Sequence, residues 1–322
     1  MINTPALLGL TSIVLAGTMM NAEAITITTD SFTGFDMDFA EVGDTTNVDD
    51  TGPDSIVHGA VSYTYRMGVN EVSEQMIEDY NTYSGGPTIT KDTRGADKPA
   101  TSVSWNEAAR FVNWLNTSQG HVAAYNFTTG GANDNISLWS SADAWQLGGE
   151  NLYRHKDAYY FLPSEDEWYK AAFYDGNSMV YYDYATGSDT VPTAVAGGTA
   201  AGTAVYGQSF ATGPADIDDA GGLSYYGTMA QSGNVYEWGE SALDGGNDTN
   251  SESRVLRGGV WVFNSGSLQS SSRTGSGPGD EGIGDGFRVA SVSAAVAAVP
   301  EPSSVGLLVI GAMGCMLRRK RG

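Results

Sequence analysis

Apolar positions recur along this chain in short runs that are separated by polar and glycine-rich stretches. Alternating isoleucine and threonine at Ile25–Thr29, and a second alternating run at Gly59–Val69, predict strands. Val72, Met76 and Tyr80 recur every four residues, which predicts a short amphipathic helix. The pattern therefore favours many short elements over a few long ones.

Two further helices are predicted from their first turns. Ser104 is followed three residues later by Glu107, and the same spacing recurs at Ser164 and Glu167. In each pair the serine side chain can bind the backbone amide of the glutamate while the glutamate binds back, which is a capping box. The first helix is expected over Ser104–Asn116, with an apolar face made of Trp105, Ala108, Ala109, Val112 and Leu115.

Long stretches have no such periodicity. Gly187–Gly222 is rich in glycine, alanine and threonine, and Ser265–Gly284 is rich in serine, glycine and acidic residues, so both are predicted to be ordered loops. No internal repeat and no domain boundary is evident between about Ile25 and Ser293. We therefore expect one domain over residues 25–293.

Both ends resemble processing signals. Residues 1–24 contain an apolar run followed by Ala22-Glu23-Ala24, which is typical of a signal peptide with its cleavage site. Residues 294–322 comprise a linker, the motif Pro300-Glu301-Pro302, a short apolar stretch and a basic end. This tail resembles the PEP-CTERM sorting tail of Gram-negative bacteria. The resemblance implies recognition by exosortase-type sorting machinery and a place in the cell envelope, on the outer surface or in the extracellular matrix. The alternative is a permanent C-terminal anchor.

Charge and cysteine content narrow the function classes. The formal net charge is −22, which opposes nucleic-acid binding because the phosphate backbone would be repelled. Carboxylates at this density can hold Ca²⁺ or can simply keep the protein soluble. The single cysteine, Cys315, lies in the apolar tail, so no disulfide, thiolate metal site or redox pair can form within residues 25–293.

Several strings, in order, resemble the formylglycine-generating enzyme (sulfatase-modifying factor) family. They are SGNVYEW (232–238), RVLRGGVW (254–261) and GFRVA (286–290), preceded by Val42–Ser73, TSVSWNEAARFVNWLN (101–116) and FLPSEDEWYKAA (161–172). The resemblance implies an α+β fold of the C-type-lectin-like formylglycine-generating-enzyme type, rich in loops, with short strands and a few helices.

The chemistry of that family does not transfer to this chain. Its oxidase uses a copper-holding cysteine pair between the second and third strings, whereas Gly259–Gly286 contains no cysteine. We therefore expect no copper and favour a protein that is not an enzyme. A related branch uses iron bound by histidines of a separate helical domain. Here only His58, His121 and His155 occur, with no metal-ligand spacing, and they are interpreted as surface residues.

The resemblance also implies a possible calcium site and a set of structural residues. Gly233 and Val235 would offer carbonyl oxygens and Glu237 a carboxylate to Ca²⁺. The family usually has Asn or Asp three residues before that glycine, and this chain has Ala230. The alternative for Glu237 is a buried carboxylate paired with arginine. A second, loosely aligned calcium site would lie near Val205 and Asp216–Asp219. Fold maintenance is expected for Arg257, Gly258, Gly259, Phe287 and Arg288.

Three functional hypotheses follow. The first is an exported, surface-sorted protein that binds a peptide, a glycan or another envelope component in the cleft where the family carries its cysteines. The second is a formylglycine-generating-type oxidoreductase that acts on sulfatases or another substrate through residues that the sequence does not identify. The third is a structural matrix or envelope protein displayed through its tail.

Overall fold

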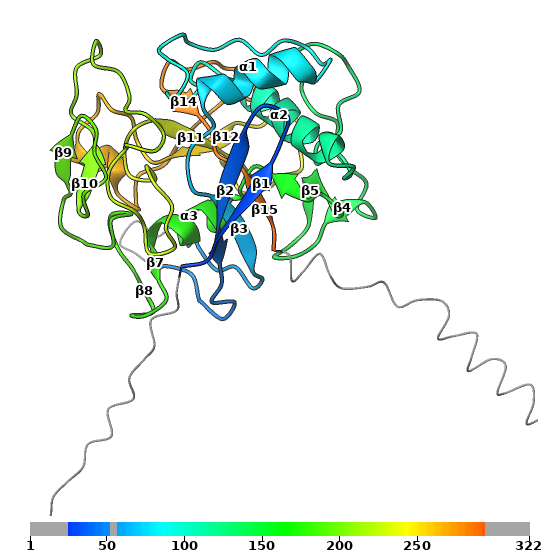
Figure 1. The fold of residues 1–322 in the computed structure, drawn as a ribbon. Helices are drawn as coiled ribbons and strands as arrows, with labels where there is room; N and C mark the ends of the chain where they lie inside the picture. The colour runs from blue at the N-terminus through cyan, green and yellow to red at the C-terminus, as the bar shows by residue number, and fades with distance from the viewer. Residues whose placement is uncertain (1–24, 52–56, 294–322) are drawn as a thin grey trace, which may run out of the picture.

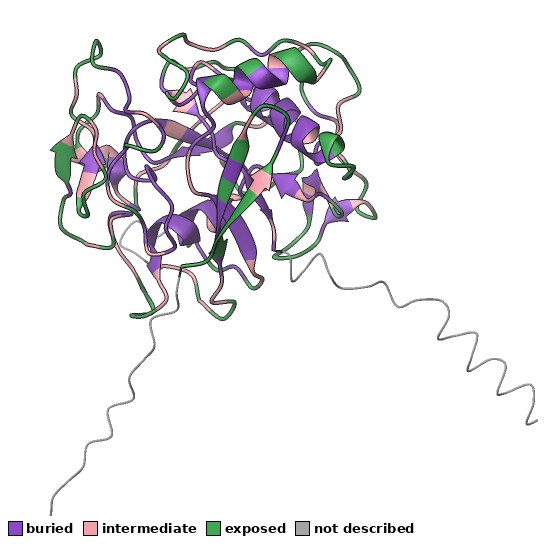
Figure 2. Ribbon diagram, viewed as in Figure 1, coloured by how far each residue is buried: buried purple, intermediate pink, exposed green. Residues whose placement is uncertain are grey.

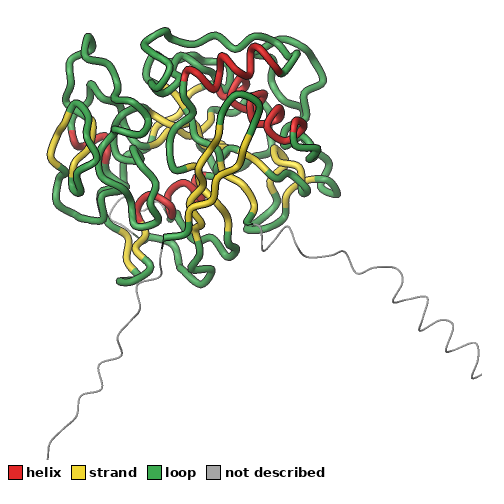
Figure 3. Tube along the Cα trace, viewed as in Figure 1, coloured by secondary structure: helices red, strands yellow, loops and turns green. Residues whose placement is uncertain are grey.

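The computed structural model describes residues 25–51 and 57–293; the predicted signal peptide and the sorting tail lie outside these residues. Loops connect short strands and three α-helices over most of the described chain (Figures 1 and 3). None of the described helices has the length and apolar character needed to span a bilayer. The predicted loop-rich α+β architecture is confirmed.

One antiparallel sheet brings together the first and last strands of the described chain. Its order is β1-β2-β3-β15-β6, and every neighbouring pair is antiparallel. The last strand, β15, therefore lies between two partners. The strands are β1 (Ile27–Ser31), β2 (Asp36–Val42), β3 (Tyr65–Gly68), β6 (Tyr160–Phe161) and β15 (Ala290–Val292).

A second sheet brings the three C-terminal strings together in space. Its order is β13-β12-β11-β14, with β11 antiparallel to β12 and parallel to β14. Glu237 on β11 stands opposite both Arg257 on β12 and Gly286 on β14. The strands are β11 (Tyr236–Ala242), β12 (Arg254–Arg257), β13 (Thr274–Ser276) and β14 (Asp285–Gly286).

All three predicted helices are present, and the first begins two residues later than the periodicity from Val72 indicates, after the N-cap Ser73. They are α1 (Glu74–Tyr83), α2 (Trp105–Ser118) and α3 (Glu165–Phe173). Both predicted capping boxes are confirmed, at Ser104 with Glu107 and at Ser164 with Glu167. Such a cap is worth about 1 kcal/mol, and here it fixes each helix start just after a buried apolar residue.

Most of α2 is buried (Figure 2), and two tryptophans join it to the second sheet. Trp105 Nε1 donates to the carbonyl of Gly239 on β11 at 3.0 Å, and Trp238 Nε1 donates to the carbonyl of Val103 at 2.9 Å. Both rings are fully buried. This reciprocal pair fixes the second sheet against the start of α2.

Three predicted segments differ in the structure. Only Tyr65–Gly68 of the run Gly59–Val69 is a strand. At the start of the run Gly59 has φ +104°, which is not a strand conformation, and a side chain there would collide with the ring of Tyr181. The predicted loop Gly187–Gly222 contains a parallel pair, β9 with β10, and Ser265–Gly284 contains a 3-10 turn and β13. These pieces are too short to produce a visible period. The remaining elements are β4 (Ala144–Trp145), β5 (Asn151–His155), β7 (Tyr174–Asp175), β8 (Val180–Tyr181), β9 (Thr193–Val195), β10 (Thr203–Val205) and η1 (Ser265–Leu268).

Candidate binding cleft and its buried ion pairs

Glu237 lies in a fully buried ion pair with Arg288. Arg288 Nε is 2.5 Å from Oε2 and Nη2 is 2.6 Å from Oε1, while Trp168 Nε1 donates to Oε2 at 2.7 Å. Arg288 also donates to the backbone carbonyls of Gly68, Val69 and Met229. Both carboxylate oxygens and both ends of the guanidinium are therefore engaged, which is the condition for a buried pair to hold a fold together.

The predicted calcium ligands lie around this pair. Gly233 has φ +112°, and a side chain there would come within 2.4 Å of the Val205 carbonyl oxygen, so glycine is required. Val235 is buried among apolar residues. An incoming Ca²⁺ would have to compete with Arg288 for Glu237, and no three His, Cys, Asp or Glu side chains of residues 25–51 and 57–293 form a metal-binding group. The calcium site remains a prediction, and the pairing of Glu237 supports its alternative.

Two arginines hold Glu165, the first residue of α3. Arg257, expected to lie against carboxylates or carbonyls, contacts Glu165 at 2.5 Å and donates to the carbonyls of Ser270 and Ser272. Arg273 donates to Glu165 at 2.7 and 2.9 Å. Burial alone would raise the pKa of Glu165, but the arginines hold that pKa below its ordinary value.

The other residues expected to maintain the fold surround the same strands. Gly258 and Gly259 have φ +96° and +85°, and a side chain on Gly259 would lie 2.8 Å from the carbonyl oxygen of Ser267. Phe287 is fully buried, and its ring packs edge-on against Phe111 of α2, with centroids 5.6 Å apart. A backbone turn that only glycine accepts readily thus follows β12, and an aromatic anchor follows β14.

A third arginine, Arg154 on β5, is buried between two carboxylates. It bonds Glu167 at 2.8 and 3.0 Å and Glu240 at 3.0 and 3.1 Å, and its guanidinium carbon lies 3.7 Å from the ring centre of Phe161. Tyr63 donates to Glu167 at 2.7 Å. Burial raises the pKa of both carboxylates, yet Arg154 holds that of Glu167 below its ordinary value while that of Glu240 stays raised. Arg154 thus binds two carboxylates, and it offsets the effect of burial more fully at Glu167 than at Glu240.

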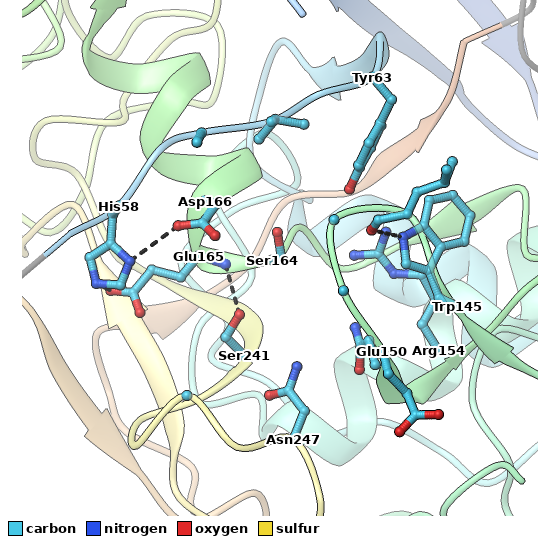
Figure 4. A pocket seen from close by; sticks show the side chains of 17 residues that line it. His58, Tyr63, Trp145, Glu150, Arg154, Ser164, Glu165, Asp166, Ser241 and Asn247 are labelled. Carbon is cyan, nitrogen blue, oxygen red and sulfur yellow. Dashed lines mark hydrogen bonds and ion pairs between the residues drawn. The ribbon is translucent and has the colours of Figure 1, made fainter. Parts of the chain in front are cut away.

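A cleft of about 320 Å³ opens beside Arg154 and Glu165. Figure 4 shows His58, Glu165 and Asp166 on one side and Tyr63, Trp145, Glu150 and Arg154 on the other. We call this the His58–Trp145 cleft. Ser241 and Asn247 also line it.

Several polar atoms on the His58 side have close neighbours, although His58 Nε2 is buried without a hydrogen-bond partner. His58 Nδ1 is 3.1 Å from Asp166 Oδ1, its Nε2 is 3.5 Å from Glu165, and the amide of Glu165 donates to Ser241 Oγ at 2.9 Å. On the facing side Glu150 is exposed, while the Trp145 ring is almost wholly buried and donates to the Leu147 carbonyl. The cleft therefore has rigid walls and an acidic, open rim.

Sequence reasoning missed most of this cleft. His58 was interpreted as a surface residue, and Arg154 belongs to no motif. The loop Ser265–Gly284, where the family would carry its cysteines, contributes no residue to the lining of this cleft, although its Arg273 binds Glu165. The capping box at Ser164 was the one available signal, because it places Glu165 and Asp166 in the first turn of α3.

Comparison with protein-family models gives two matches. The family model for the sulfatase-modifying factor enzyme 1-like domain matches residues 11–292. The chain belongs to this family. A second model, the PEP-CTERM protein-sorting motif, matches residues 298–321, which marks the protein for export, for surface sorting in bacteria and for recognition by exosortase-type machinery. Both resemblances read from the sequence are confirmed.

Solved structures of similar fold include three distant proteins. Treponema denticola variable protein 1 is 19% identical, with a TM-score of 0.58 over 83% of this chain and 99% of that one. The protein described as CarF is 20% identical (TM-score 0.52, 78% and 94% covered). PvdO from Pseudomonas aeruginosa is 17% identical (TM-score 0.50, 83% and 98%). No curated protein matches. At these identities the comparison establishes the fold, and the activity has to be argued from the site.

Proposed function

We propose that this sulfatase-modifying-factor domain is a binding module that is exported by a signal peptide, displayed at the cell envelope, and takes an uncharged, hydroxyl-rich ligand of the saccharide class in the His58–Trp145 cleft. The observation that carries the proposal is the lining of that cleft, where carboxylate, amide and hydroxyl side chains stand beside aromatic residues. Ligand pockets combine apolar walls with a few polar groups in fixed positions, and this cleft has both.

Charge selects among ligands. Glu150 and Asp166 at the rim carry negative charge, and the whole chain has a formal net charge of −22, so anionic ligands would be repelled. Arg154 adds little opposite charge, because Glu167 and Glu240 already bind it. A neutral glycan gains hydrogen bonds to these acceptors without an electrostatic penalty.

A glycan array on the full chain, followed by calorimetric titration of the best neutral saccharide, tests the proposal. Glu150→Ala removes one exposed acceptor and is expected to weaken binding about tenfold, which corresponds to about 1.4 kcal/mol. Asp157→Asn removes an exposed charge outside the cleft lining and should leave the affinity unchanged.

Two results would contradict the proposal. One is the same affinity in the Glu150→Ala variant and the wild-type chain. The other is conversion of a peptide cysteine to an aldehyde by the purified chain supplied with copper, which would instead establish the oxidoreductase alternative. The only cysteine of the sequence lies in the tail, so the domain itself offers copper no thiolate.

A further inference from the structure

A second pocket, of about 170 Å³, shares no residue with the His58–Trp145 cleft. Its walls come from β2, from the turn before α1, from α1 and from two loops. We call it the Glu71 pocket. Its lining residues are Asp36, Met37, Asp38, Asn70, Glu71, Met76, Asp97, Ile217 and Asp218.

Among the residues that the structure describes, no cationic group lies within ion-pair distance of the five carboxylates of this pocket. None of them forms an ion pair with another described residue. Lys98, the chain neighbour of Asp97, pairs instead with Asp216 at 2.9 Å. Asp36, Asp38, Asp97 and Asp218 are exposed, so four negative side chains surround the entrance.

Glu71 provides an independent observation. Its side chain is only 1% exposed, Oε2 accepts from Asn234 Nδ2 at 2.6 Å, and Oε1 is buried without a hydrogen-bond partner. A buried carboxylate oxygen without a donor costs free energy, on the order of 1–3 kcal/mol or more. The other buried glutamate nearby, Glu237, has both of its oxygens filled by Arg288. The Glu71 pocket therefore lacks a donor where the neighbouring site has one.

The other lining residues indicate what kind of hydrogen-bond donor would fit the pocket. Met37, Met76 and Ile217 are apolar and give the pocket a side against which methylene groups can pack. The carboxylates do not converge as a metal site would, since no three acidic, histidine or cysteine side chains within 25–51 and 57–293 form a metal-binding group. A flexible chain that ends in an N–H cation fits these walls better than a bare metal ion does.

We propose that the Glu71 pocket binds a primary alkylammonium group, which enters with its methylenes against Met37, Met76 and Ile217 and donates to Glu71. A lysine side chain of a partner peptide and a free linear diamine both present this chemistry. The role is separate from saccharide binding, because the two pockets share no lining residue.

Binding should also release a proton. Burial, and then the Glu237 carboxylate, raise the pKa of Glu71 well above its ordinary value, and Arg288, Asn234 and the backbone amide of Val235 offset this only in part. Glu71 is therefore protonated more easily in the free pocket than an exposed carboxyl group is. An arriving ammonium group stabilises the charged form, so the carboxyl proton passes to the buffer.

Calorimetric titration of the full chain with 1,5-diaminopentane tests the proposal, and hexamethonium serves as a dication that has no N–H group. We expect binding of the diamine alone, with heats in phosphate and Tris buffers that differ by the release of a proton. Glu71→Gln should weaken the diamine at least tenfold, whereas Asp157→Asn should leave it unchanged. The Gln side chain keeps an acceptor for Asn234, so the variant is expected to fold, which a melting curve checks.

Titration with a blocked tripeptide, acetyl-Gly-Lys-Gly-amide, distinguishes a lysine side chain of a partner peptide from a free diamine as the source of the ammonium group. Tighter binding of the tripeptide than of the diamine assigns the pocket to a peptide, and the reverse assigns it to a free amine; both support the ammonium chemistry. The proposal is overturned if hexamethonium binds as well as the diamine, if Glu71→Gln keeps wild-type affinity, or if neither amine binds; Glu71-dependent binding of Ca²⁺ alone would assign the pocket to a metal ion instead.

Discussion

Glu237 and Glu71 are both buried, and they lie close enough for the charge of one to affect the other, yet their surroundings differ completely. Glu237 has a bidentate arginine and a tryptophan donor. Glu71 has the side-chain amide of Asn234 and the backbone amide of Val235 as neutral donors, and its Oε1 is buried without a hydrogen-bond partner. A buried acid with its cation in place serves the fold, whereas a buried acid that lacks one opens onto a pocket and is available for a ligand.

The largest expected effect comes from breaking the complete pair. Arg288→Met leaves Glu237 charged and unpaired in the core, so the free energy of unfolding should fall by about 3–5 kcal/mol. Urea unfolding measures this. Lys156→Met, which breaks an exposed pair with Asp143, should cost less than about 1 kcal/mol. Equal losses in the two variants would mean that Arg288 and Glu237 are not the structural pair described here.

A smaller effect of opposite sign is expected at Glu71. Its pKa is raised in the folded state, so above the ordinary value near 4.5 the folded protein binds more protons than the unfolded chain. Stability from this group is therefore present at low pH and lost as pH rises. Glu71→Gln removes that loss. The free energy of unfolding of the variant, measured with urea, should therefore rise relative to that of the wild type as the pH increases from 4 to 8. A difference that does not change with pH would contradict this assignment.

Asp285 on β14 is a partly buried acid, and its substitution is expected to have the smallest effect on stability of the three. Burial raises its pKa to about 6, while the backbone amide of Gly282 opposes the rise. The stability that Asp285 contributes is lost between its ordinary pKa near 3.8 and about pH 6. The free energy of unfolding of Asp285→Asn should therefore rise relative to that of the wild type only within that pH range. Above pH 6 the difference should level off. A gain in stability that continues to grow well above pH 6 would contradict this assignment.

The sequence predicted what depends on neighbours along the chain. The capping boxes at Ser104 and Ser164 are confirmed because a cap involves four consecutive residues. The strings that resemble the family predicted the fold for a similar reason, because each is a run of consecutive residues and their order can be read along the sequence.

The cleft and the Glu71 pocket could not be predicted in the same way. Arg154 meets Glu240 across 86 positions, and Asn234 meets Glu71 across 163. No local pattern encodes such separations. Whether a carboxylate is paired depends on which strands become neighbours, and that emerges only when the two sheets assemble.

The position of β15 has a mechanical consequence. This strand ends at Val292, just before the segment that leads to the sorting motif, and it is bonded to β3 on one side and β6 on the other. Ladder bonds in antiparallel sheets run perpendicular to the strands. A pull on the tail, directed along the strand, would load the bonds on both sides in shear, so that they share the force instead of opening one by one. Arg66 reinforces this clamp by bonding Ser291 Oγ and the Val292 carbonyl. The domain is therefore held by its interior strand at the end where it would be tethered.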